Sequence, residues 1–199
     1  MGKWEKSNLE IPSFNSPFPK ECKLPVRSGK NLVWSPPNED FLKVNFDISK
    51  LDNGQAAYGF VIRNSNGEVL MASAKALGVF PLILMAEAMG LLEGLNGAIS
   101  LQNRSRKVII EGDNISVINT MSRNANVPWT IANILMDAYA LLGRFQEVKF
   151  QHCYREANRL ANFMAHKGNS HPEVWFWHPP YCIDFSLLIR KDVLSWPPD

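Results

Sequence analysis

The 199-residue sequence lacks the features that mark several large classes of protein. Its cysteines, Cys22, Cys153 and Cys182, are scattered and odd in number, which indicates neither a disulfide framework nor a zinc site. No apolar run reaches the length of a membrane span, and the N-terminus lacks the apolar core of a signal peptide. A net charge of +2 is too small to indicate a nucleic-acid-binding protein by itself. We therefore expect an intracellular protein in a reducing compartment, either the nucleus or the cytoplasm, with no membrane partner.

Composition divides the chain into three parts. Residues 1–37 are rich in proline and polar residues without a sustained apolar period, so we expect an extended or disordered leader, with Trp34 docked on the domain edge. Residues 38–169 show regular hydrophobic patterns, and a hydrophobic content of 46% suffices for one globular domain but hardly for two. Residues 170–199 are rich in aromatic residues and proline, and we expect an irregular segment that covers the domain.

Hydrophobic periodicity predicts an α/β domain with a five-stranded mixed sheet flanked by helices. Leu42, Val44 and Phe46 alternate with Lys43 and Asn45, which predicts a half-buried first strand. Further strands are expected over 56–63, 69–77, 108–110 and 148–152, and helices over about 82–101, 114–122, 128–142 and 156–165. The first three strands form an antiparallel meander, and a right-handed crossover makes the first and fourth strands parallel neighbours.

Three acidic residues are expected to meet at one edge of this sheet. Asp47 ends the first strand, and Asp113 stands where the fourth strand gives way to a helix capped by Asn114. Glu87 lies within the apolar stripe of the long helix, where a carboxylate is costly to bury without a partner. The alternatives are that Asp113 is only a turn residue and that Glu87 lies at the rim of the stripe. Carboxylates that converge repel one another, and the usual resolution is a divalent cation, most plausibly Mg²⁺.

Several segments in this order resemble the ribonuclease H fold, and more closely the plant retroelement-type ribonuclease H domain. The resemblance runs from Trp34 to about Gly168 and rests on Lys43–Asp47, Gly59–Asn64, Ala86–Ala88, Leu91–Leu95, Glu111–Asn114 and His152–Ala161. It implies cleavage of the RNA strand of RNA–DNA hybrids with two magnesium ions. Asp47, Glu87 and Asp113 match the first three acids of that site. His152 matches a mobile histidine that aids proton transfer or product release; alternatively it is an exposed residue at a strand end.

One position departs from the pattern of the family. Asn162 stands where the resemblance places a fourth acid, and an amide oxygen can touch a metal but brings no charge, so the second Mg²⁺ would be bound weakly. The resemblance implies sequence-independent hybrid binding through phosphate and 2′-hydroxyl contacts by a monomer. The candidates for these contacts are Arg106, Lys107, Arg155 and Arg159, although such charges often only solvate a surface.

Three hypotheses follow from the sequence. The first is an active, metal-dependent hybrid nuclease. The second is a nucleic-acid-binding domain whose cleavage is weakened by Asn162. The third is a protein-interaction module that uses the aromatic tail, including Trp175, Trp177 and Trp196.

Overall fold

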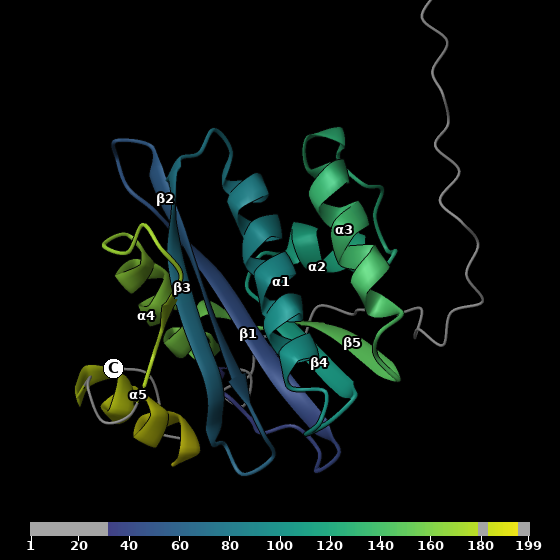
Figure 1. The fold of residues 1–199 in the computed structure, drawn as a ribbon, viewed down its shortest axis with the longest axis vertical. Coiled ribbons are helices and arrows are strands. Elements are labelled where there is room, and N and C mark those ends of the chain that lie inside the picture. Colours follow the sequence, from purple (N-terminus) through teal and green to yellow (C-terminus); the bar gives the residue numbers. More distant parts are fainter. Residues whose placement is uncertain (1–31, 179–182, 195–199) are drawn as a thin grey trace, which may run out of the picture.

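The computed structural model describes residues 32–178 and 183–194 (Figure 1). Most of the predicted leader therefore lies outside the described residues. The elements are, in order, β1 (Phe41–Lys50), β2 (Gln55–Arg63), β3 (Val69–Val79), α1 (Ile83–Ser100), β4 (Lys107–Gly112), α2 (Ile115–Met121), the 3-10 turn η2 (Trp129–Ile131), α3 (Ala132–Leu142), β5 (Glu147–His152), the 3-10 turn η3 (Arg155–Ala157), α4 (Arg159–Gly168), β6 (Trp175–Phe176) and α5 (Ile183–Val193).

The strands form one mixed sheet in the order β5-β4-β1-β2-β3-β6. β1 runs antiparallel to β2 and parallel to β4, which confirms that the first and fourth strands are parallel neighbours. The predicted count of five strands was one short, because β6 in the tail pairs with β3. The tail also contains α5, so within its described residues the prediction of an irregular segment was wrong. The strand β6 has two residues, which is too few to show an alternation of apolar and polar residues in the sequence. The helix α5 buries only Phe185 and Asp192, so its pattern of hydrophobic residues is weak.

Helices cover both faces of the sheet (Figure 1). α1, α2 and α3 lie on one face and build the larger core with Val44 and Phe46 of β1. α4 and α5 lie on the other face, where Val61, Met164 and Phe185 belong to a smaller core. The site described below forms where β1 passes between these two layers. No helix of the described residues is long and apolar enough to cross a bilayer.

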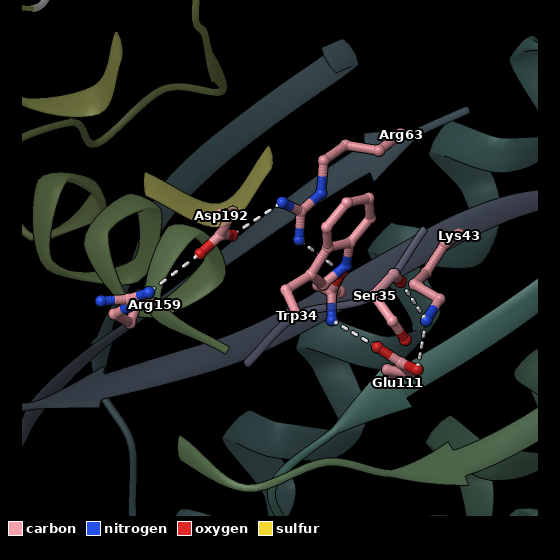
Figure 2. Close-up of polar contacts among 8 residues, drawn as sticks. Trp34, Ser35, Lys43, Arg63, Glu111, Arg159 and Asp192 are labelled. Carbon is pink, nitrogen blue, oxygen red and sulfur yellow. Dashed lines mark hydrogen bonds and ion pairs between the residues drawn. The ribbon is translucent and has the colours of Figure 1, made fainter. Parts of the chain in front are cut away.

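The prediction of a half-buried β1 was wrong, because both faces of this strand are covered. Lys43 and Asn45 point toward the α4 layer and are 3% and 0% exposed. Lys43 donates to Glu111 at 2.6 Å, and Asn45 donates to the other oxygen of Glu111 at 3.0 Å. Trp34, 3% exposed, lies over this region, which confirms its predicted docking (Figure 2). The alternation of polar and apolar residues in the sequence indicated that one face of the strand is exposed to solvent. In the structure these polar side chains are buried and form hydrogen bonds with one another instead.

Two glycines allow the helices to approach the strands that carry the site. A Cβ on Gly59 of β2 would lie 2.1 Å from the backbone nitrogen of Ala165 in α4. A Cβ on Gly94 of α1 would lie 2.8 Å from Val44 of β1. Gly59 is also the register partner of Asp47. Close packing at these positions therefore brings α1 and α4 to the two sides of β1 at its acidic end.

Candidate metal centre and active site

Three carboxylates converge beside the second half of β1 and the end of β4. The prediction that Asp47 ends the first strand was wrong, because β1 continues to Lys50 through its pairing with β2. Asn45 of β1 pairs in register with Glu111 of β4, so Asp47, two residues further along β1, and Asp113, just after the end of β4, also become neighbours. Glu87 reaches the same place from the first turns of α1. One carboxylate oxygen from each of the three acids lies within 4.8 Å of the others. The structure thus brings together the acids that the sequence placed at one sheet edge.

Burial and mutual repulsion make these acids hard to ionise. Burial, followed by the charge of Asp113, raises the pKa of Asp47 to about 7. Burial, followed by the charges of Asp47 and Asp113, raises the pKa of Glu87 to about 9. Burial also raises the pKa of Asp113, against the opposing effects of Arg155, its own backbone and His152. Such shifts favour a bound cation, since a cation stabilises all three carboxylates in their ionised form.

The oxygen atoms of the centre fit a divalent cation. Asp47 Oδ2 and Glu87 Oε2 are buried without a hydrogen-bond partner. Asp47 Oδ1 accepts from the backbone N–H of Ile48 at 2.8 Å, which leaves Oδ2 as the oxygen available to a ligand. Carboxylate oxygens are the ligands that Mg²⁺ prefers in proteins. The donor set and its unsatisfied oxygens therefore fit a divalent cation.

Asn162 lies at the edge of this centre, beside Asp47. A hydrogen bond from its side chain contributes to lowering the pKa of Asp47. α4 is held at this place by Asn158, whose Nδ2 donates to the carbonyl of Phe46 at 2.9 Å. The role of Asn158 was not predicted from the sequence. The signal was present, because helical spacing puts Asn158 on the buried stripe with Ala161 and Ala165, where a polar residue needs a partner.

Asn114 is the second residue whose role was missed. Its oxygen accepts from the backbone N–H groups of Ser116 and Val117, which confirms the predicted cap of α2. Its side chain also hydrogen-bonds Glu87 and lowers the pKa of that acid. Since the oxygen caps the helix, the amide nitrogen is the donor to Glu87. One asparagine therefore orders both the start of α2 and the buried carboxylate.

His152 lies at the end of β5, beside the centre. Its Nε2 is 3.1 Å from the backbone carbonyl of Asp113, so this nitrogen carries the proton. Its ring stands edge-on to Tyr154 at 5.4 Å between centroids, and Nδ1 is buried without a partner. The His152 side chain is half-buried beside the backbone of Asp113.

The four predicted nucleic-acid-binding residues do not form one surface. Arg155 is exposed, and its charge lowers the pKa of both Asp47 and Asp113, which places it next to the centre. Arg159 pairs with Asp192 of α5 at 3.4 Å. Arg106 and Lys107 lie at the start of β4, the end opposite Asp113, and Lys107 pairs with Asp40 at 3.1 Å.

Solved structures share this architecture. The N-terminal RNase H domain of Rv2228c from Mycobacterium tuberculosis is 25% identical, with a TM-score of 0.61, over 65% of this chain and 94% of that one. RNase H1 from Halobacterium salinarum is 20% identical, with a TM-score of 0.60, over 65% of this chain and 98% of that one. LC11-RNase H1, solved in complex with an RNA/DNA hybrid, is 19% identical, with a TM-score of 0.60, over 65% of this chain and 96% of that one. The chain therefore has the ribonuclease H fold.

The amino-acid sequence assigns the chain to a particular family. The model of the reverse transcriptase-like family matches residues 45–168, and the chain belongs to this family. The match spans β1 to α4 and includes all three acids, His152 and Asn162. Trp34 and α5 lie outside it. Among curated proteins, no sequence matches the chain significantly.

Proposed function

We propose that the protein is a divalent-metal-dependent nuclease that cleaves the RNA strand of RNA–DNA hybrids. The observation that carries the proposal is the cluster of Asp47, Glu87 and Asp113, whose oxygens lie within 4.8 Å of one another and include two buried atoms without partners. Unpaired buried carboxylates are costly to a fold and are retained where they bind a ligand. The fold it shares with LC11-RNase H1, which was solved with such a hybrid, supports the substrate class.

The residues at this centre would have different roles. Asp47, Glu87 and Asp113 would hold Mg²⁺, which supplies charge stabilisation to a phosphodiester and a more acidic bound water. The exposed guanidinium of Arg155 is placed to attract a phosphate toward the acids. Asn114 and the backbone of Ile48 hold Glu87 and Asp47 in position through hydrogen bonds. This arrangement reads the backbone of the substrate rather than its bases, so binding would be independent of sequence.

His152 would assist proton transfer from the edge of the centre. The hydrogen bond from Nε2 to the Asp113 carbonyl fixes the ring beside the acids, while Nδ1 has no partner within the described residues. A ring held by one nitrogen can exchange a proton at the other. Release of the Nε2 contact would be needed for the ring to swing toward a product.

A weakened nuclease is the second candidate, and Asn162 favours it. The amide can donate to Asp47 and offer an oxygen to a metal, but it supplies no negative charge. A missing unit charge about 4 Å from a cation corresponds to roughly 4 kcal/mol at an effective dielectric near 20. The second of two cations would therefore bind orders of magnitude more weakly than beside a carboxylate.

The test is cleavage of an end-labelled RNA–DNA hybrid by the wild type, Asp113→Asn and Asn162→Asp, across a range of Mg²⁺ concentrations. An active nuclease predicts cleavage by the wild type that Asp113→Asn abolishes. Asn162→Asp should then cut faster and at lower Mg²⁺. Labelled double-stranded RNA and DNA serve as substrate controls.

The remaining outcomes separate the hypotheses. Cleavage by Asn162→Asp but not by the wild type would contradict the active nuclease and support the weakened one. If neither protein cuts and neither binds a hybrid at low salt, both nucleic-acid hypotheses fail. Binding without cutting by either would leave a binding domain whose acids no longer serve catalysis.

A further inference from the structure

A buried polar network connects β1, β2, β4, α4 and α5 (Figure 2). Asn45 precedes Asp47 by two residues on β1 and so shares its strand face, and Glu111 of β4 lies two residues before Asp113, which follows the end of that strand. The network also includes residues from segments outside the family match. Its members are Trp34, Ser35, Lys43, Asn45, Arg63, Glu111, Arg159 and Asp192.

Asp192 joins three elements in this network. Its Oδ2 accepts from Arg63 of β2 at 2.8 Å, and its Oδ1 lies 3.4 Å from Arg159 of α4. The Asp192 and Arg63 side chains are 0% and 1% exposed, whereas that of Arg159 is 17% exposed. One carboxylate on α5 therefore holds a guanidinium of the sheet and a guanidinium of α4 together, and Figure 2 shows Asp192 between the two.

Arg63 is fixed on its other sides. Its guanidinium lies 3.5 Å from the centroid of the Trp34 ring, and Nη2 donates to Asn45 at 3.0 Å. Arg159 reaches solvent more readily. If the charge of Asp192 is lost, the repulsion between the two guanidinium groups must be relieved by movement of Arg159, and with it the first turn of α4.

The first turn of α4 carries the contacts to the centre. Arg159 follows Asn158, which donates to the carbonyl of Phe46 next to Asp47. Asn162 lies one turn further along α4 and hydrogen-bonds Asp47. A displacement at Arg159 is therefore transmitted within one helical turn to the groups that set the position of Asp47.

We propose that Asp192 is a positioning residue for the metal centre, and that α5 is thereby part of the catalytic unit. Asp192 acts through Arg159 and Arg63, which hold the first turn of α4 against β1. The inference that this turn is positioned by α5 stands on the ion pairs alone, while its consequence for metal binding rests on the proposed function. The unit then extends from Trp34 to α5, beyond the 45–168 region of the family match.

The test compares Asp192→Asn and Asp192→Glu in the full chain with Asp184→Asn as a matched control. Asp184 lies on α5 as well but is exposed. Asparagine keeps the shape of the side chain and removes its charge, and glutamate restores the charge. The first readout is hydrogen exchange followed by mass spectrometry, without metal and well below the melting temperature. The second readout is Mg²⁺ binding measured by calorimetry. The third is hybrid cleavage, from which we take the Mg²⁺ concentration that gives half-maximal activity and the KM for the hybrid.

We expect Asp192→Asn to speed exchange in the first turns of α4 while α1 stays protected, and to weaken Mg²⁺ binding about tenfold, the size usual for residues that support metal ligands. The KM for the hybrid should change little, Asp192→Glu should recover part of the loss, and Asp184→Asn should match the wild type. A lower melting temperature with unchanged α4 exchange and unchanged Mg²⁺ affinity would refute the proposal and leave Asp192 a general stabiliser. If wild type binds no Mg²⁺, the proposed function fails, and α4 exchange still decides whether Asp192 positions that helix.

Discussion

Replacement of Glu87 by glutamine should make the metal-free protein more stable. Glutamine has the shape of glutamate and can accept the hydrogen bond that Asn114 offers. It removes a carboxyl that is 5% exposed and lies beside Asp47 and Asp113. A residue that costs stability in the absence of its ligand is expected at a functional site rather than in a structural core.

The size of the effect follows from the raised pKa of Glu87, about 9 in the fold against an ordinary 4.5. At pH 7.5 the folded protein keeps this carboxyl protonated while the unfolded chain ionises it. At about 1.36 kcal/mol per pH unit, this opposes folding by up to about 4 kcal/mol. The penalty is absent below pH 4.5 and grows as the pH rises toward 9. For a chain of this length, removing the full penalty should raise the melting temperature by roughly 8–16 °C.

The measurement is thermal unfolding in EDTA between pH 5 and 9, with Glu93→Gln on the same helix as the control. The gap between Glu87→Gln and wild type should be small at pH 5 and widest at pH 9. Added Mg²⁺ should raise the melting temperature of wild type and leave that of Glu87→Gln nearly unchanged. A variant no more stable than wild type in EDTA, or a gap that does not depend on pH, would refute the reasoning.

Three further substitutions test the packing and charge around the centre. Gly59→Ala should prevent stable folding, as seen by circular dichroism, because the added Cβ would collide with the backbone of α4. Gly143→Ala should fold normally, because its Cβ would enter open space. Equal stability of the two variants would contradict the close packing at Gly59. Trp34→Ala should lower the free energy of unfolding by about 3–5 kcal/mol in denaturant titrations, whereas exposed Trp129→Ala should change it by less than about 0.5 kcal/mol. Arg155→Gln should reduce the slope of log hybrid affinity against log salt by about one; an unchanged slope would exclude a phosphate contact.

The strands and the acids were predictable because their signals are local. The alternation of Leu42, Val44 and Phe46 fixes one face of β1, and a parallel β4 brings Asp113 beside Asp47 whatever the details of packing. Glu87 was identified because a carboxylate in an apolar stripe has few explanations. A few neighbouring residues and the handedness of one crossover were therefore enough to predict these strands and the three acids.

The buried polar network was not predictable in the same way. Lys43 and Asn45 carry the pattern of a solvent-exposed face, and nothing near them in sequence announces Glu111 or Arg63 as partners. Asp192 lies 129 positions from Arg63. Polar groups that satisfy one another look like surface residues until the chain is folded, because periodicity records polarity and not pairing.

The two groups of buried charges differ in one respect that separates structure from function. Both carboxylate oxygens of Glu111 have a partner, and so do both oxygens of Asp192. Asp47 and Glu87, buried to a similar degree, each keep an oxygen without one. The fold supplies lysine and asparagine to the buried carboxylate of Glu111, only two residues before Asp113, and arginine to that of Asp192. Among the described residues, no lysine or arginine forms an ion pair with Asp47, Glu87 or Asp113, which is what a site that takes its positive charge from a ligand requires.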